Sequence, residues 1–301
     1  MTSFEDIPPL LRRIDAEKKI TGVARHNDVD ISFTTFGAGE PLLFQHGFPD
    51  TGETWANQIA EFSKSHLVIV PTLRGYPPSS APSDPSRYAL REVAGDILAV
   101  LDTLGIEKVT LIGHDWGGVV LQAFALGFPE RVKRLALLNS PVIRPFNELI
   151  TADQEQQELS KYTLQYQAYA PGDPIDLDYV VRNIRDLSWR QYVKSYLQAS
   201  PLIGMLSYYK VNYLAPPYLP LDESDRDTFV SKFPALIVFG KEDPYFSIRH
   251  LSDIWRWFTG SVRLTLVPGA GHWVHQDAPE LVNAELRSWL ELDLSSPLSN
   301  H

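Results

Sequence analysis

The chain contains no cysteine among its 301 residues. That absence excludes disulfide bonds, thiolate metal sites and a cysteine nucleophile. Long apolar runs are also missing, because no segment approaches the roughly 18 uninterrupted apolar residues of a membrane-spanning helix. The N-terminal segment interleaves charges with short apolar groups and lacks the apolar stretch of a secretory signal. From these absences we expect a cytoplasmic protein.

Positively charged residues are fewer than negatively charged ones. The 27 lysines and arginines stand against 37 aspartates and glutamates, which gives a net charge of -10. This balance disfavours a nucleic acid or an anionic membrane as partner. The hydrophobic share of 44% and the charged share of 21% are typical of a globular chain with a well-filled core. We therefore expect a small-molecule partner, and the sequence leaves a homodimer open.

Short β-rich runs alternate with segments of helical period, and this alternation is the signature of an α/β fold. A helix is predicted between the second and third runs, with apolar residues at helical spacing from Leu90 to Leu104 and an end at Gly105. Continuous apolar runs predict a mostly parallel central sheet that is buried on both faces and flanked by helices. The runs are residues 42–44, 66–70, 109–112, 134–138, 235–239 and 262–267.

The alternation stops between residues 141 and 230. This segment has no convincing strand, but it has many tyrosines and several stretches compatible with a helix. Ninety residues without secondary structure would be too long for a loop in a compact domain. We predict a helical cap over residues 141–230, inserted between the two parts of an α/β core, residues 1–140 and 231–301.

The stretch TLIGHDWGGVVLQ, residues 110–122, has the pattern of a nucleophile elbow. A strand ends at Ile112, small residues at 113, 117 and 118 allow a tight turn, and a helix follows. Asp115 stands at the apex, where the nucleophile belongs. The alternative is an ordinary turn in which Asp115 caps the helix.

Two further residues follow the ends of later strands. Asp243 lies in the loop after the run at 235–239, and His272 lies in the loop after the run at 262–267. Asp115, Asp243 and His272 follow the nucleophile, acid and histidine order of α/β hydrolases. His275 is a competing base, but we expect it at the entry to a helix.

The run at 42–44 is followed by HGFPD. Its position predicts that the backbone N–H groups of Phe48 and Trp116 form an oxyanion hole. His46 and His114 are expected to make structural hydrogen bonds around these turns.

Five motifs of this chain resemble the α/β-hydrolase superfamily and, within it, the branch of epoxide hydrolases and haloalkane dehalogenases. Family members usually have aspartate in place of Thr72 and glycine in place of Pro77, in a motif we take to be structural. The motifs are HGFP (46–49), RGYPPSSAP (74–82), GHDWGG (113–118), GKED (240–243) and GAGHW (269–273). The resemblance implies the α/β-hydrolase fold and hydrolysis without a cofactor or metal.

A carboxylate at the apex changes the expected substrate. A carboxylate that attacks an acyl group would form a reactive anhydride, whereas displacement at a saturated carbon gives an alkyl ester that water can cleave. Free aspartate has a pKa of about 3.9 and needs no base to ionise it. His272, oriented by Asp243, would then activate the water that attacks the Asp115 ester.

The resemblance to epoxide hydrolases implies two cap tyrosines that supply a proton or hydrogen bonds to the opening epoxide. KYTLQYQ (161–167) resembles the first cap motif and places Tyr162 at the donor position. LSYYKVN (206–212) resembles the second and places Tyr209 there. The chain has 13 tyrosines, and the nearest alternatives are Tyr166 and Tyr208.

The preferred prediction is an epoxide hydrolase that forms a vicinal diol from an apolar epoxide and water. Phe48, Trp116, Tyr166 and Trp189 are expected to contact the substrate. One alternative is a haloalkane dehalogenase, in which Trp116 and a second N–H donor would hold the halide. Another is a biosynthetic α/β hydrolase that acts on a bulky substrate. A non-catalytic binding protein is disfavoured because every position of the triad is filled.

Overall fold

The computed structural model describes residues 19–292 and contains an eight-stranded sheet in the order β1-β2-β4-β3-β5-β6-β7-β8. β2 runs antiparallel to both β1 and β4, and the pairs from β4 to β8 are parallel. The N-terminal segment discussed above lies outside the described residues. The strands are Ile20–His26, Val29–Phe36, Glu40–Gln45, His66–Pro71, Val109–His114, Val132–Leu138, Ala235–Gly240 and Val262–Val267, numbered β1 to β8 in chain order.

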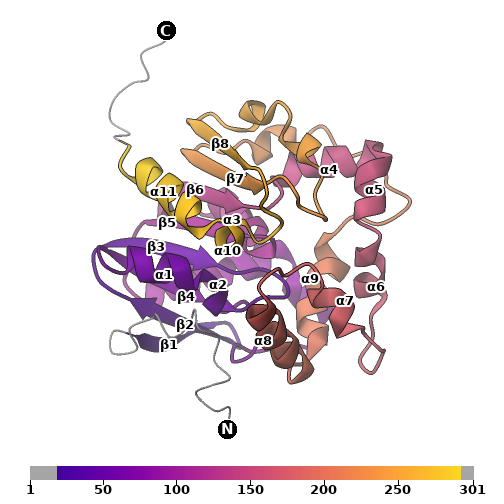
Figure 1. The fold of residues 1–301 in the computed structure, drawn as a ribbon, viewed down its shortest axis with the longest axis horizontal. Helices are drawn as coiled ribbons and strands as arrows, with labels where there is room; N and C mark the ends of the chain where they lie inside the picture. Colours follow the sequence, from indigo (N-terminus) through magenta and orange to yellow (C-terminus); the bar gives the residue numbers. More distant parts are fainter. Residues whose placement is uncertain (1–18, 293–301) are drawn as a thin grey trace.

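Helices cover both faces of this sheet (Figure 1). Successive strand residues point to opposite faces, so Leu43 and Leu111 pack with α2 and α3, whereas Leu42 and Ile112 pack with α1 and α11. The bounds are α1 Ala56–Phe62, α2 Leu90–Thr103, α3 Trp116–Gly127, α10 Val274–Asp277 and α11 Pro279–Leu290. The predicted α/β architecture is therefore confirmed, including the helix before Gly105, which ends at Thr103 and is followed by the positive φ of Gly105.

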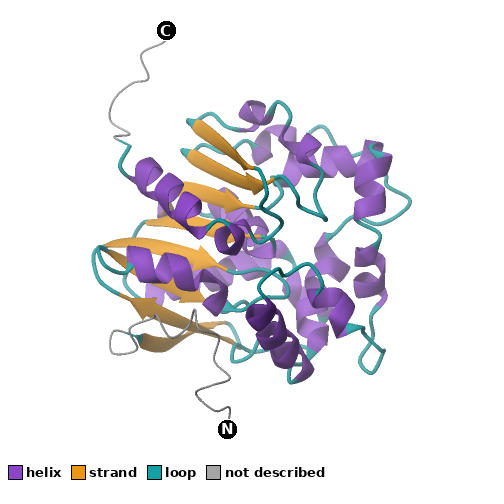
Figure 2. Cartoon of the chain, in the orientation of Figure 1, coloured by secondary structure: helices purple, strands orange, loops and turns teal. Residues whose placement is uncertain are grey.

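The remaining α-helices lie between β6 and β7, in the segment that the sequence predicted to be helical. Figure 2 shows these helices gathered beside the sheet rather than on either of its faces. None of the helices within residues 19–292 is long and apolar enough to cross a membrane. The bounds are α4 Ile143–Ala152, α5 Gln154–Leu159, α6 Tyr162–Ala168, α7 Leu177–Val181, α8 Leu187–Gln198 and α9 Leu202–Asn212.

Two parts of the sheet differ from the sequence prediction. The hairpin of β1 and β2 was not predicted, although Asn27 and Asp28 connect the strands and Asn27 has the positive φ of 56° that short hairpin turns favour. β8 was expected to be buried on both faces, but it is an edge strand on which Leu264 and Leu266 are exposed. Its apolar sequence does not reveal that, within residues 19–292, β8 pairs with β7 alone.

A buried ion pair fixes the start of the sheet to α2. Arg74, which follows β4, donates from Nε to Oδ2 of Asp96 at 2.6 Å. The two residues are 1% and 3% exposed. The ring of His26 in β1 lies 2.9 Å from the other oxygen of Asp96. The RGYPP motif therefore has a structural role in this fold.

Replacing Arg74 by leucine would remove the guanidinium from the buried Asp96 carboxylate and leave the ring of His26 as its neighbour. We expect R74L to lower the free energy of unfolding by about 3–5 kcal/mol, measured by urea denaturation. Arg87 makes an exposed ion pair with Asp28, so R87L should lower the free energy of unfolding far less than R74L. Equal losses for the two variants would contradict the structural role of the buried pair.

Candidate active site

Asp115 occupies a strained position between β5 and α3. Its φ of 51° and ψ of -128° are unusual for a residue with a side chain. The turn is held by close backbone packing, because a Cβ on Gly117 would lie only 2.2 Å from the carbonyl oxygen of Gln45 in β3. Ser140 also donates a 2.8 Å hydrogen bond to the carbonyl of Asp115. This geometry is that of the nucleophile elbow.

The two oxygens of the Asp115 carboxylate have different surroundings. Oδ1 accepts a 2.8 Å hydrogen bond from the backbone N–H of Phe48. Oδ2 lies 3.6 Å from Nε2 of His272. Gly47 is needed beside this carboxylate, since a Cβ there would lie 2.4 Å from Oδ1. The second amide expected at this point belongs to Trp116, the first residue of α3.

His272 is oriented by Asp243, as the order of the motifs suggested. Nδ1 of His272 lies 2.8 Å from Oδ2 of Asp243. The same oxygen accepts a 2.7 Å hydrogen bond from the side chain of Asn139, and Oδ1 accepts from the amides of Tyr245 and Phe246. The structure thus brings Asp115, His272 and Asp243 together. Asn139 was missed, although it directly follows β6 and the rule that located Asp243 applies to it as well.

The charge balance at His272 depends on these carboxylates. Burial favours the neutral ring and lowers its pKa, but the charge of Asp243, the hydrogen bonds to Asp115 and Asp243, and the charge of Asp115 outweigh it. Together they raise the pKa of His272 to about 10. His272 is therefore the cationic partner of the two carboxylates at neutral pH.

Tyr162 and Tyr209 lie close to Asp115, on the neighbouring helices α6 and α9. Their rings are 6.2 Å apart, and the ring of Tyr209 also meets those of Trp116 and Phe48 at 5.1 and 5.6 Å. Burial, neighbouring tyrosines and the charge of Asp115 raise the pKa of both hydroxyls. Both groups therefore retain their protons in the presence of the carboxylate.

Other tyrosines of the segment use their hydroxyls elsewhere. Tyr208, the neighbour of Tyr209, donates to the carbonyl of Arg74 at 3.1 Å. Tyr213 lies 2.9 Å from the hydroxyl of Ser160. Tyr166 stays close to the site, with its ring 5.1 Å from that of Tyr209. Of the two alternatives to the predicted pair, the structure therefore places Tyr166, but not Tyr208, beside Asp115.

Two cavities meet at Asp115. The larger has a volume of about 250 Å³ and the smaller about 10 Å³, and Asp115, Tyr162 and Tyr209 line both. Trp116 lines the larger cavity. Phe48 and Tyr166 line the smaller one.

Trp189 occupies a different place from the substrate contact that the sequence predicted. It lines neither of these two cavities. Its indole N–H donates to Oδ1 of Asp50 at 2.9 Å, and Trp273 donates to Oδ2 at 2.7 Å. Asp50 thus joins α8 to the loop that carries His272. Sequence reasoning missed Asp50, although it completes the HGFPD stretch.

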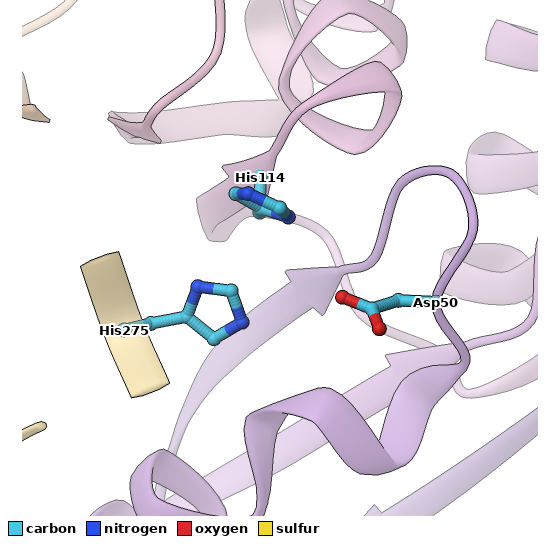
Figure 3. Close-up of side chains that lie close together, drawn as sticks. All are labelled: Asp50, His114 and His275. Carbon is cyan, nitrogen blue, oxygen red and sulfur yellow. The ribbon is translucent and has the colours of Figure 1, made fainter. Parts of the chain in front are cut away.

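Asp50, His114 and His275 form a buried group beneath this loop (Figure 3), with possible metal-binding atoms within 4.8 Å of one another. Both oxygens of Asp50 and one ring nitrogen of each histidine are already engaged. The hydroxyl of Thr54 lies 2.9 Å from Asp50 and 2.8 Å from Nε2 of His275, and His114 Nε2 lies 3.0 Å from the carbonyl of His272. Within the described part of the chain, Nδ1 of His114 and Nδ1 of His275 have no hydrogen-bond partner. A metal ion that took Asp50 as a ligand would compete with the hydrogen bonds that this carboxylate already accepts. The group supports the His272 loop.

Burial and the nearby charge of His272 lower the pKa of His275 to about 3. His275 faces Thr54 and the ring of Trp55. His46 accepts from the amide of Leu73 at 3.1 Å, which agrees with the structural role expected for it. Of the histidines considered, His272 is the one that the structure places against Asp115.

Comparison with known proteins agrees with this geometry. A family model described as alpha/beta hydrolase fold matches residues 40–180. Epoxide hydrolase 4 of Mus musculus is 29% identical, over 89% of this chain and 78% of its own. An epoxide hydrolase of Caballeronia sordidicola is 28% identical, over 92% and 96%. The crystal structure of a variant epoxide hydrolase from Bacillus megaterium superimposes with a TM-score of 0.80, at 27% identity, over 90% and 100%.

The chain therefore has the α/β-hydrolase fold. Its relatives across most of the chain are epoxide hydrolases, at 25–29% identity. The resemblance of the sequence motifs to α/β hydrolases, and among them to epoxide hydrolases, is therefore confirmed.

The ion pair between His272 and Asp115 leads to a prediction about pH. In D115N the charge of Asp115 is lost while His272 stays buried, so the pKa of His272 should fall from about 10. The Cε1 proton of His272 reports this by NMR titration. As a control, D173N changes an exposed acid elsewhere and should leave the pKa of His272 unchanged. An unchanged pKa in D115N would contradict the pairing.

Proposed function

We propose that this protein is an epoxide hydrolase that acts through an ester on Asp115. The observation that carries the proposal is the carboxylate at the elbow, with Oδ1 held by the amide of Phe48 at 2.8 Å and Oδ2 facing His272 at 3.6 Å. A relative with 27% identity was crystallised with a diol as its product, which supports the same reaction class here.

In the first step, Oδ2 of Asp115 attacks an epoxide carbon and the carbon–oxygen bond of the ring breaks. The electron pair of that bond goes to the epoxide oxygen. Tyr162 and Tyr209 hydrogen-bond this oxygen, and one of them gives it a proton. Because burial raises the pKa of both hydroxyls, the proton is held until the strongly basic alkoxide develops.

Ester formation also prepares the second step. It removes the negative charge of Asp115, which is one of the causes of the raised pKa of His272. Burial and the lost charge then both favour a neutral ring, so His272 gives up its proton, which restores the tyrosinate left by the first step. The neutral ring can then take a proton from water. The resulting hydroxide attacks the ester carbonyl, while the amide of Phe48, and that of Trp116, stabilise the charge on Oδ1. On collapse, the bond from the carbonyl carbon to the alkyl oxygen breaks, and His272 gives that oxygen its proton, which releases the diol. The remaining proton of the attacking water passes from the new carboxyl group of Asp115 to His272 and restores their ion pair.

In this proposal residues 141–230 act as a cap. α6 and α9 supply the two tyrosines, and the helices of this segment exclude bulk water from the ester. The hydrogen bond from Trp189 to Asp50 at 2.9 Å attaches the cap to the core. The substrate is an uncharged epoxide, since Asp115 is the one ionisable acid or base among the residues that line the larger cavity, tyrosines aside.

The hydrogen bonds of the tryptophans near the site disfavour the haloalkane dehalogenase. A halide needs N–H donors directed at the leaving atom, and Trp116 supplies one candidate at the nucleophile. The other indoles near the site, Trp189 and Trp273, both donate to Asp50. Two tyrosine hydroxyls at the cavity suit an alkoxide better than a halide.

An assay with an aryl epoxide and a terminal bromoalkane side by side tests the proposed function. We expect diol formation from the epoxide and no bromide release, because the site offers two tyrosine hydroxyls to the leaving atom and Trp116 as a single candidate indole N–H donor. D115A, which lacks the nucleophile, is the blank. Bromide release without diol formation would instead support the dehalogenase.

The tyrosine assignment is tested by Y162F together with Y209F. Loss of both hydroxyls should lower kcat for diol formation by about 10²–10⁴-fold, the usual contribution of positioned general acids. Y208F is the matched control, because the hydroxyl of Tyr208 is bound to the carbonyl of Arg74, and its kcat should stay near that of the wild type. Full activity in the double variant would show that other groups protonate the epoxide oxygen.

A further inference from the structure

The two cavities that meet at Asp115 are very unequal. Since Tyr162 and Tyr209 line both the 250 Å³ cavity and the 10 Å³ cavity, the proposed acids stand at their junction. An epoxide ring held between Asp115 and these hydroxyls therefore borders both cavities, whose other walls are formed by different residues.

The small cavity has the size of a single water molecule, which needs roughly 10–15 Å³. Phe48, Pro49 and Val180 are among its walls, together with Tyr245 and His272. The aromatic rings leave little freedom: Tyr245 meets the ring of His272 at 4.9 Å, and Phe48 meets Tyr166 at 5.4 Å. Asp115 and His272 supply polar partners for one water, which is the reactant of the second step.

The large cavity suits an apolar group. Trp116, Val119 and Phe146 are among its walls. The side chain of Asn212 lies there too, but it already bonds the backbone of Leu90 and Tyr88 at 3.2 and 2.9 Å. An aryl or alkyl substituent can therefore enter without breaking these hydrogen bonds of Asn212.

We propose that the enzyme selects terminal epoxides with one apolar substituent and rejects trans-disubstituted epoxides. This inference rests on the proposed function. A terminal epoxide directs its substituent into the large cavity and presents only hydrogens to the small one. A trans-disubstituted epoxide carries carbon groups on opposite sides of the ring, and the second group would displace the hydrolytic water and clash with the walls.

The test compares kcat/KM for styrene oxide, trans-β-methylstyrene oxide and trans-stilbene oxide. The added methyl should lower kcat/KM by roughly 10–200-fold, the range that a single apolar group commands in a tight pocket. The added phenyl of trans-stilbene oxide should abolish measurable turnover.

Val180 offers a way to change the small cavity alone. It is 4% exposed, and V180A removes two methyl groups from the wall. We expect the ratio of kcat/KM for trans-β-methylstyrene oxide to that for styrene oxide to rise at least about fivefold, a part of the penalty expected for one misplaced methyl. V181A is the matched control, because Val181 is 1% exposed and lines neither cavity. Its ratio should stay that of the wild type.

The possible outcomes separate the two proposals. Hydrolysis of styrene oxide with a large penalty for the methyl supports the inference, and this comparison needs no variant to fold. Equal turnover of styrene oxide and trans-stilbene oxide would overturn the inference and leave the epoxide hydrolase intact. Failure to hydrolyse any of the three would contradict the proposed function itself.

Discussion

The carboxylate of Asp115 must be buried, negatively charged and directed at the cavities at the same time, and the surrounding elements meet this requirement. Burying a charge is costly unless it is paired and hydrogen-bonded. Phe48 supplies the hydrogen bond and His272 the opposite charge. His272 in turn needs Asp243, which Asn139 holds at 2.7 Å. The same coupling changes the role of the histidine: once the carboxylate becomes an ester, its former ion-pair partner becomes the base in our mechanism.

Much of the site could be predicted because it follows the ends of parallel strands. Asp115, Asp243 and His272 come after β5, β7 and β8, and parallel strands bring these ends to one edge of the sheet. Asn139 obeyed the same rule and was overlooked, since an asparagine after a strand is also common in turns. The partners of Trp189 had no such signal. Its bond to Asp50 joins positions 139 residues apart and depends on how the helical segment docks.

The strands of the sheet also divide into those that the sequence predicted and those that it did not. Continuous apolar runs revealed the central strands, whereas the hairpin of β1 and β2 alternates polar and apolar residues and was passed over. The cavities are the least predictable feature. Their sizes depend on side chains contributed by strand ends, α3, α6, α7 and α9, and sequence gives composition without volume. The difference in volume between the two cavities nevertheless arises from side-chain packing alone. In our proposal this difference determines which class of epoxide binds beside the nucleophile and where the water lies.

The covalent role of Asp115 is the central claim, and repeated turnover in heavy-oxygen water tests it most directly. Peptide mass analysis would follow the label in the segment that contains Asp115, and the diol from a single turnover would be weighed separately. The account predicts that heavy oxygen enters the Asp115 carboxylate and that the first diol carries unlabelled oxygen from the protein. Label found only in the diol from the first turnover onward would mean that water attacks the epoxide directly, and it would contradict the ester mechanism.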